Sequence, residues 1–261
     1  MQRSLWRILP LIFLPVAAQA APIAIVNPGF EDISGESAYN EFTFGPLNGW
    51  NLYDPGNVTS NGDGPTYFIG TLRPEISPGV FAFFPGGAPE GARVGIAFNF
   101  AGSGGGGAYG LQQTLSATLQ ANTSYSLQVQ VGNIASGTAV DNTFYNLNGF
   151  PGYRIDLLAG SEVLNSESNT GSIPEGEFAL RTVNFTTGAT HARLGEALGI
   201  RLVNLNVVDS AHPTADLEVD FDNVSLTADA VPEPGTLALL ALTGAALLAA
   251  GPRKRRGPAI P

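Results

Sequence analysis

The chain has 261 residues, no cysteine and a formal net charge of −10. Between residues 21 and 230 there are 21 acidic residues, six arginines and no lysine, so this segment carries a formal charge of −15. These values exclude disulfides, cysteine nucleophiles and cysteine-bound metals. They also argue against a nucleic-acid-binding protein, because such an acidic domain offers no basic surface to phosphates.

The first 20 residues are typical of a secretory signal peptide. Arg3 and Arg7 accompany an apolar stretch over residues 8–18, and Ala18-Gln19-Ala20 forms a small-x-small cleavage site. Cleavage after this site would make Ala21 the first residue of the mature chain. A buried first helix is the alternative, and two prolines within the stretch argue against it.

Short runs of alternating apolar residues between turn residues predict β-strands throughout residues 21–229. The clearest run is Tyr125 to Val131, in which every second residue is apolar. Further strands are predicted at 94–100, 153–157, 183–185, 198–202 and 217–221, and weaker ones at 23–26, 66–72 and 111–115. Eight or nine short strands in about 210 residues indicate one all-β sandwich domain.

The last predicted strand changes its alternation near its middle. Apolar residues from 217 to 221 share one parity, whereas Val224 and Leu226 share the other. This change predicts a β-bulge or bend near Asp222 and Asn223, which would re-aim a carboxylate and an amide. The alternative is that the strand simply ends there.

The chain changes character after Asp229. Pro232-Glu233-Pro234 is followed by an uncharged stretch rich in Leu and Ala, residues 235–251, and then by Arg253-Lys254-Arg255-Arg256. A helix over 235–251 would be about 25 Å long, and bilayer thinning would let it span a core of about 30 Å. The basic run predicts a cytoplasmic C-terminus, with the folded domain across the inner membrane.

This triplet, apolar helix and Arg-rich end closely resemble the PEP-CTERM sorting signal. The resemblance covers about a tenth of the chain, and residues 257–261 extend further than the signal usually does. It implies recognition by an exosortase in a Gram-negative bacterium, cleavage near the triplet, and delivery to the cell surface or exopolysaccharide matrix. We therefore expect a signal peptide (1–20), an ectodomain (21–229) and a sorting signal (230–261) with a transient membrane helix (235–251).

A looser resemblance covers the ectodomain. The segment Val26-Asn27-Pro28-Gly29-Phe30-Glu31, followed by Gly49-Trp50, resembles the opening of galactose-binding-like jelly rolls, which include several carbohydrate-binding module families. Residues 219–226 resemble the closing strand of these domains, and the runs at 111–115 and 123–131 resemble their middle strands. The resemblance implies a jelly-roll β-sandwich whose first and last strands come together.

The same resemblance implies a structural calcium site where the terminal strands meet. The matching carboxylates are Glu31 and Asp222. Calcium takes six to eight oxygen ligands from carboxylates and carbonyls, and a turn beside Glu31 and a bulge beside Asp222 could supply both. Without the resemblance, these residues would be read as surface acids of an acidic protein.

Catalysis has little support in the sequence. His191 and His212 are the only histidines, and neither has a metal-ligand partner three or four residues away. There is no Gly-x-Ser-x-Gly elbow, and no pair of acids stands out as a glycosidase pair. We therefore expect a protein that is not an enzyme.

Aromatic side chains are the candidates for ligand binding, because the C–H faces of sugars stack on rings. Trp50 occupies the place of a core tryptophan in the resembling family, so we expect a structural role for it. Tyr109 and Tyr145 are the predicted ligand-binding residues, and Tyr145 lies in an Asn-rich segment.

The expected function is a glycan-binding or matrix-associated surface protein. A structural or adhesive protein without a specific ligand is one alternative, and a surface glycan hydrolase is another.

Overall fold

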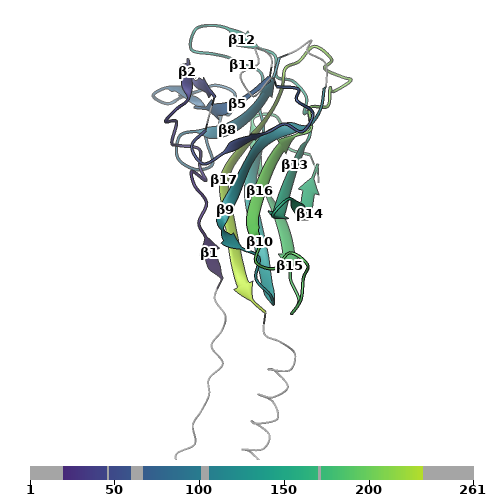
Figure 1. Cartoon of the computed structure of the whole chain (residues 1–261). Helices are drawn as coiled ribbons and strands as arrows, with labels where there is room; N and C mark the ends of the chain where they lie inside the picture. The colour runs from purple at the N-terminus through teal and green to yellow at the C-terminus, as the bar shows by residue number, and fades with distance from the viewer. Residues whose placement is uncertain (1–19, 46, 60–66, 101–105, 170–171, 232–261) are drawn as a thin grey trace, which may run out of the picture.

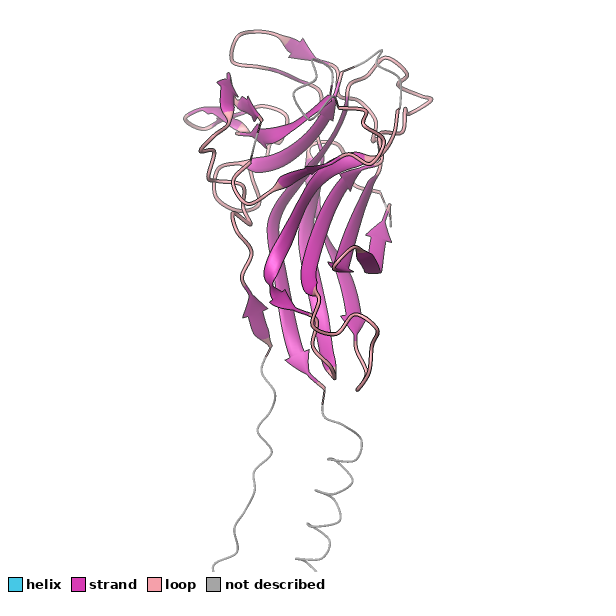
Figure 2. Ribbon diagram, viewed as in Figure 1, coloured by secondary structure: helices cyan, strands magenta, loops and turns pink. Residues whose placement is uncertain are grey.

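The computed structural model describes residues 20–45, 47–59, 67–100, 106–169 and 172–231. Residues 1–19 of the predicted signal peptide, the Pro-Glu-Pro triplet and the predicted membrane helix lie outside this part of the chain. Within it, every regular element is a strand (Figure 2). No helix in these ranges is long and apolar enough to cross a membrane.

Two antiparallel sheets form a sandwich (Figure 1). The larger sheet has the order β15-β10-β17-β8-β5-β3-β2, and β1 also pairs with β17. Its strands are β15 (Glu177–Thr186), β10 (Thr123–Asn133), β17 (Leu217–Ala230), β8 (Val94–Asn99), β5 (Tyr67–Leu72), β3 (Phe42–Phe44), β2 (Ser37–Tyr39) and β1 (Ala21–Ile23).

The smaller sheet has the order β14-β13-β16-β9-β4. Its strands are β14 (Glu162–Ser168), β13 (Tyr153–Ala159), β16 (Ala197–Asn204), β9 (Tyr109–Thr118) and β4 (Asn51–Tyr53). Two short hairpins complete the described strands: β6 (Glu75–Ser77) with β7 (Val80–Phe81), and β11 (Gly137–Thr138) with β12 (Phe144–Tyr145). The prediction of an all-β sandwich is confirmed, and every run predicted as a strand overlaps an observed one.

The main core lies between the two sheets and follows from the alternation along the strands. Leu127 and Val129 of β10 are fully buried against residues of the smaller sheet such as Ile200 and Leu202. Trp50 is 3% exposed and stacks on Phe30 with ring centroids 5.3 Å apart. Its predicted structural role is confirmed.

β17 continues through the predicted bulge. Its register against β10 slips by one residue between Asp222 and Ser225, and Asn223 adopts a φ of 47°. The slip keeps both halves of the strand facing inward, because Phe221 before it and Val224 after it are both buried in the core. The bulge is therefore confirmed, and the alternative of a strand end is wrong.

The outer face of the larger sheet, which points away from the smaller sheet, is also covered. β8 is buried at all six of its positions, which requires apolar contacts on both faces of the sheet. A second apolar cluster joins this face to the loops around residues 82–84 and 139–147, and we call these loop residues the loop cover. These loops lie at the end of the domain opposite β1 and the end of β17 (Figure 1). Side chains beneath them are removed from water.

Candidate active site

β17 places three carboxyl groups on the outer face of the larger sheet. Glu218, Asp220 and Asp222 alternate with Val219 and Phe221, whose side chains point into the core. The three acids are 1%, 0% and 0% exposed. Burial of a carboxylate is costly unless it is paired or hydrogen-bonded, so the surroundings of each acid need an explanation.

Asp220 lies in the middle of the larger sheet. Its cross-strand partners are Gly132 on β10 and Ile96 on β8. A Cβ atom at Gly132 would come within 2.6 Å of the Phe178 ring and 3.0 Å of the Asp220 Cβ atom. Phe178 in turn packs on Phe84 of the loop cover, with ring centroids 4.4 Å apart. The Asp220 carboxyl group therefore lies among apolar side chains. Position 132 on the neighbouring strand has to be glycine, because any side chain there would clash with Phe178 and Asp220.

Glu218 faces a row of phenyl rings. Its cross-strand partner is Phe98, and Phe98 stacks on Phe68 with centroids 4.7 Å apart and an interplanar angle of 22°. Phe100 meets Phe98 edge-on at 4.7 Å and is 37% exposed. The row thus runs from the buried Glu218 carboxyl group to the surface of the domain.

Glu218 and Asp220, which we call the β17 acid pair, have no hydrogen-bond partner outside the pair. This holds for all four of their carboxyl oxygens within the described part of the chain. The two groups influence each other's ionisation through a side-chain interaction that favours a proton on Asp220 and the ionised form of Glu218. Burial raises the pKa of Glu218 to about 8, with Asp220 opposing the shift and the charge of Asp216 adding to it. Burial, followed by the charge of Glu218, raises the pKa of Asp220 well above its usual range. The pair therefore keeps a proton at neutral pH.

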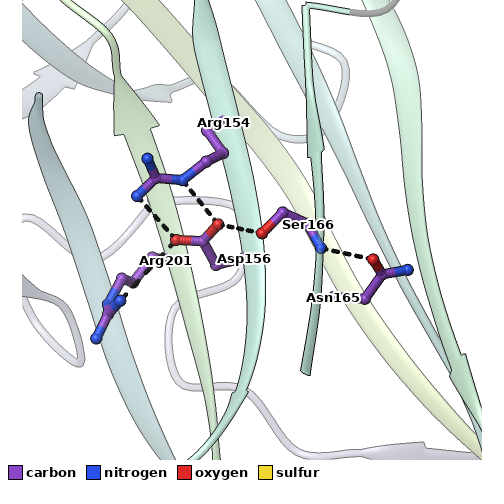
Figure 3. A network of polar contacts seen from close by, with 5 residues as sticks. All are labelled: Arg154, Asp156, Asn165, Ser166 and Arg201. Atoms are coloured by element: carbon purple, nitrogen blue, oxygen red, sulfur yellow. Dashed lines mark hydrogen bonds and ion pairs between the residues drawn. The ribbon is translucent and has the colours of Figure 1, made fainter. Parts of the chain in front are cut away.

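Asp156 shows how this fold satisfies a buried carboxylate elsewhere. It is 0% exposed on the outer face of the smaller sheet, and it accepts hydrogen bonds from Arg154 Nε (2.8 Å), Arg154 Nη2 (3.0 Å) and Ser166 Oγ (2.7 Å) (Figure 3). Arg201 Nη1 lies 4.0 Å from its second oxygen. Asp156 is a paired structural acid, whereas the β17 acid pair has no such partners.

The structure brings the two predicted calcium ligands to one loop. Glu31 accepts hydrogen bonds from the backbone N–H groups of residues 92 and 93 at 2.7 and 2.8 Å, and Asp222 accepts one from the N–H of Glu90 at 2.8 Å. Burial raises the pKa of Asp222 to about 7, and backbone hydrogen bonds oppose this shift while the charges of Glu90 and Glu31 add to it. No group of three or more His, Cys, Asp or Glu side chains among the described residues is placed to hold a metal ion. Calcium binding therefore stays a prediction.

Calcium binding to the folded state predicts a higher melting temperature. A hundredfold excess of calcium over Kd would add about 2.7 kcal/mol to the free energy of unfolding, and excess chelator would reverse it. Asp222→Ala is expected to remove this response, whereas Asp156→Asn, far from the loop, should keep it. Scanning calorimetry with calcium and then chelator makes the measurement. An unchanged melting temperature in the unmodified protein contradicts the site.

The two predicted ligand-binding tyrosines do not form an exposed platform. Tyr109 is fully buried at the start of β9 and offers no ring face to a sugar. Tyr145 is partly buried on β12, and its ring centroid lies 5.7 Å from that of Phe42 and 6.2 Å from that of Phe83. Tyr145 thus belongs to the loop cover over the larger sheet.

Two protein families match the chain. Residues 230–256 match the PEP-CTERM protein-sorting motif, so the predicted sorting signal is confirmed and the protein is an exported surface protein processed by an exosortase. Residues 21–227 match the family described as HpiC1-like, HpiC1 cyclase. The chain belongs to the HpiC1-like cyclase family. No curated protein matches it.

Solved structures of cyclases resemble this HpiC1-like domain closely. The apo form of a cyclase from Fischerella sp. is 37% identical, with a TM-score of 0.66, over 82% of this chain and 98% of that one. The Stig cyclase Fisc from Fischerella sp. TAU, in complex with (3Z)-3-(1-methyl-2-pyrrolidinylidene)-3H-indole, is 36% identical, with a TM-score of 0.66, over 82% and 100%. A cyclase from Fischerella sp. TAU in complex with 4-(1H-indol-3-yl)butan-2-one gives the same values.

The expectation that this protein is not an enzyme is wrong, because it belongs to a cyclase family. The acids at 218 and 220 match none of the catalytic signatures considered above, which were histidine pairs, a serine elbow and a glycosidase pair. Two signals could have pointed to them. The acids alternate within a strand of strongly apolar residues, and the apolar run Ala82-Phe83-Phe84 belongs to the cluster that covers this face of the sheet.

Proposed function

We propose that this protein is an exported cyclase that closes a ring in an apolar, aromatic substrate by proton transfer at the β17 acid pair. The observation that carries the proposal is the acid pair itself. It is buried, it has no hydrogen-bond partner outside the pair in the described part of the chain, and it faces phenyl rings within a domain of a cyclase family. A carboxyl group kept neutral by burial is a proton donor at neutral pH.

The proposed reaction is an isomerisation. Asp220 donates its proton to a carbon–carbon double bond or a basic atom of the substrate, which becomes a cation. A second π bond attacks the cationic centre, so one carbon–carbon bond forms and one π bond is lost. Loss of a proton from the cyclic cation to the acid pair restores the starting state of the protein. The atoms of substrate and product are therefore the same, and positioned proton transfer of this kind contributes roughly 10²- to 10⁴-fold to a rate.

The proposed substrate class is a flat aromatic compound that carries an alkene. The rings of Phe98 and Phe178 beside the acid pair favour such a compound, because aromatic rings stack on one another. The ligands of the related Fischerella cyclases contain an indole ring, which supports an indole or a similar bicyclic ring as the aromatic part.

The experiment that tests this function is a search for an isomeric product. The protein is incubated with 3-alkenylindoles, and mass spectrometry with NMR looks for cyclic products of unchanged mass. We expect ring closure with at least one alkenylindole and none with the heat-denatured protein. Asp156→Asn should retain the activity, since Asp156 lies on the other sheet. Absence of any isomer across alkenes of different length contradicts the proposal.

We further propose that the cyclase acts outside the cytoplasm of a Gram-negative bacterium and passes transiently through the inner membrane. The sorting motif supports this route, and the basic run at 253–256 would be its cytoplasmic stop. The loop cover lies at the end of the domain opposite Ala230, where the sorting signal begins (Figure 1). A protein held by its C-terminus would therefore present its active-site end away from the anchor.

A second role that we propose is weak retention in the extracellular polysaccharide. The matrix-directed sorting motif supports it, as do two exposed rings at the loop end, Phe144 (64%) and Tyr39 (46%). Phe144→Ala should lower the fraction of protein retained on neutral insoluble glycans several-fold, because ring stacking would be lost. Val163→Ala, at an exposed position on β14, is the matched control. Equal retention of both variants in a pull-down contradicts this role.

A further inference from the structure

We propose that Glu218 and the phenyl rings of Phe98 and Phe68 form a subsite for positive charge, which holds the cationic centre of the substrate or of the intermediate that it becomes. The inference rests on the proposed cyclase function for its biological meaning. It concerns binding rather than proton donation, so it can be tested without turnover.

The geometry supplies both parts of a cation site. Glu218 is 1% exposed and lies directly across from Phe98, so the two side chains stand on the same face of the sheet as close neighbours. Phe98 and Phe68 are stacked, and phenyl faces attract cations through their quadrupole, most strongly where water is excluded. The partly exposed Phe100 connects this place to the surface.

No basic side chain in the described part of the chain forms an ion pair with Glu218. Two groups act on the ionisation of Glu218 besides its burial. Asp220 on the same strand acts through a side-chain hydrogen bond, Asp216 just before the strand acts through its charge, and both are acids. On β8 the facing residue is the apolar Phe98. Outside the acid pair, neither oxygen of Glu218 has a hydrogen-bond partner in the ranges that the structure describes, in contrast to Asp156 with its arginine. Glu218 therefore has no positive partner among the described residues, and a bound cation would supply the charge that favours its ionised form.

The ligand that suits this place is an organic cation rather than a metal ion. Calcium and magnesium require several oxygen ligands in a shell, whereas Glu218 is flanked by hydrocarbon rings. An alkylammonium, iminium or allylic cation has a diffuse charge and an apolar surface, so one carboxylate and two rings can satisfy it. The cyclisation proposed above generates a charge of this kind.

A pair of probes of the same shape tests the subsite. One is the N,N,N-trimethyltryptammonium cation, and the other is its neutral carbon isostere, 3-(3,3-dimethylbutyl)indole. We expect the cation to bind at least about tenfold more tightly by titration calorimetry.

Proton release is a second readout of the same subsite. Burial holds Glu218 protonated at pH 7, since its pKa is about 8. A bound cation favours the carboxylate, so the cation should also release close to one proton, measured by repeating the titration in buffers of different ionisation enthalpy. The isostere should release none.

Variants separate this subsite from the proposed reaction. Glu218→Gln should remove both the preference for the cation and the proton release, while binding of the neutral isostere, which reports a folded site, stays the same. The control Asp156→Asn, on the other sheet, should keep the preference. If no alkenylindole is cyclised but the preference holds, the proposed function fails and the subsite stands. Equal binding of both probes to the unmodified protein, or a preference that survives Glu218→Gln, overturns the subsite.

Discussion

Replacing Asp220 by asparagine is expected to lower the turnover number for ring closure by roughly 10²- to 10⁴-fold. Asparagine has nearly the same size and can occupy the same place between Gly132 and Ile96. It cannot donate an acidic proton to an alkene. Because the shape of the site is preserved, the KM for the substrate should change little, so the loss belongs to the chemical step.

Measurement of kcat and KM separately decides this prediction. Asp156→Asn is the matched control, since it replaces another fully buried aspartate whose partners are Arg154 and Ser166. It should lower stability without a comparable loss of kcat. For the unmodified protein, kcat should fall at alkaline pH as the acid pair loses its proton. An Asp220→Asn variant whose kcat stays within roughly threefold of the unmodified value refutes Asp220 as the proton donor.

The sandwich was predictable because most of its long strands carry their own signal. Alternation of buried and exposed residues in β10 and the parity change in β17 are local patterns, and both appear in the structure as expected. β14 was missed because it is an edge strand with a polar sequence (Glu162-Val163-Leu164-Asn165-Ser166-Glu167-Ser168) and mostly exposed side chains. Such a strand is held by pairing with β13, and its own sequence gives no period.

The active site was not predictable in the same way, because its character comes from contacts between distant segments. On a strand with one face in the core, Glu218 and Asp220 look like the solvent-exposed half of the alternation. They are buried because loops around residues 82–84 and 139–147 close over the outer face of the sheet. No pattern within β17 reports these contacts. The same limit applies to Tyr109, whose complete burial depends on neighbours far away in the sequence.

Unfolding free energy should fall as the pH rises from 5 to 9, which is the opposite of what a protein with well-paired carboxylates shows. Burial raises the pKa of Glu218 from 4.5 to about 8 and the pKa of Asp220 well above 3.8. Between the unfolded and folded pKa values, the folded state binds more protons than the unfolded state. The stabilisation by these protons is complete below the unfolded pKa and is lost as the pH rises through the folded pKa. One such group can account for up to roughly 4 kcal/mol, at about 1.4 kcal/mol per pKa unit.

Denaturant titrations at pH 5, 7 and 9 in the presence of chelator make the measurement. Chelator is needed because calcium at Glu31 and Asp222 would add a pH dependence of its own. Glu218→Gln should be more stable than the unmodified protein at pH 9 and should show a shallower slope, since a neutral amide costs less to bury than a carboxylate. Asp156→Asn should be less stable at every pH but keep the slope, because its β17 acid pair is intact. If stability instead rises between pH 5 and pH 9, the acid pair is ionised in the folded protein, and the neutral donor on which the proposed chemistry depends does not exist.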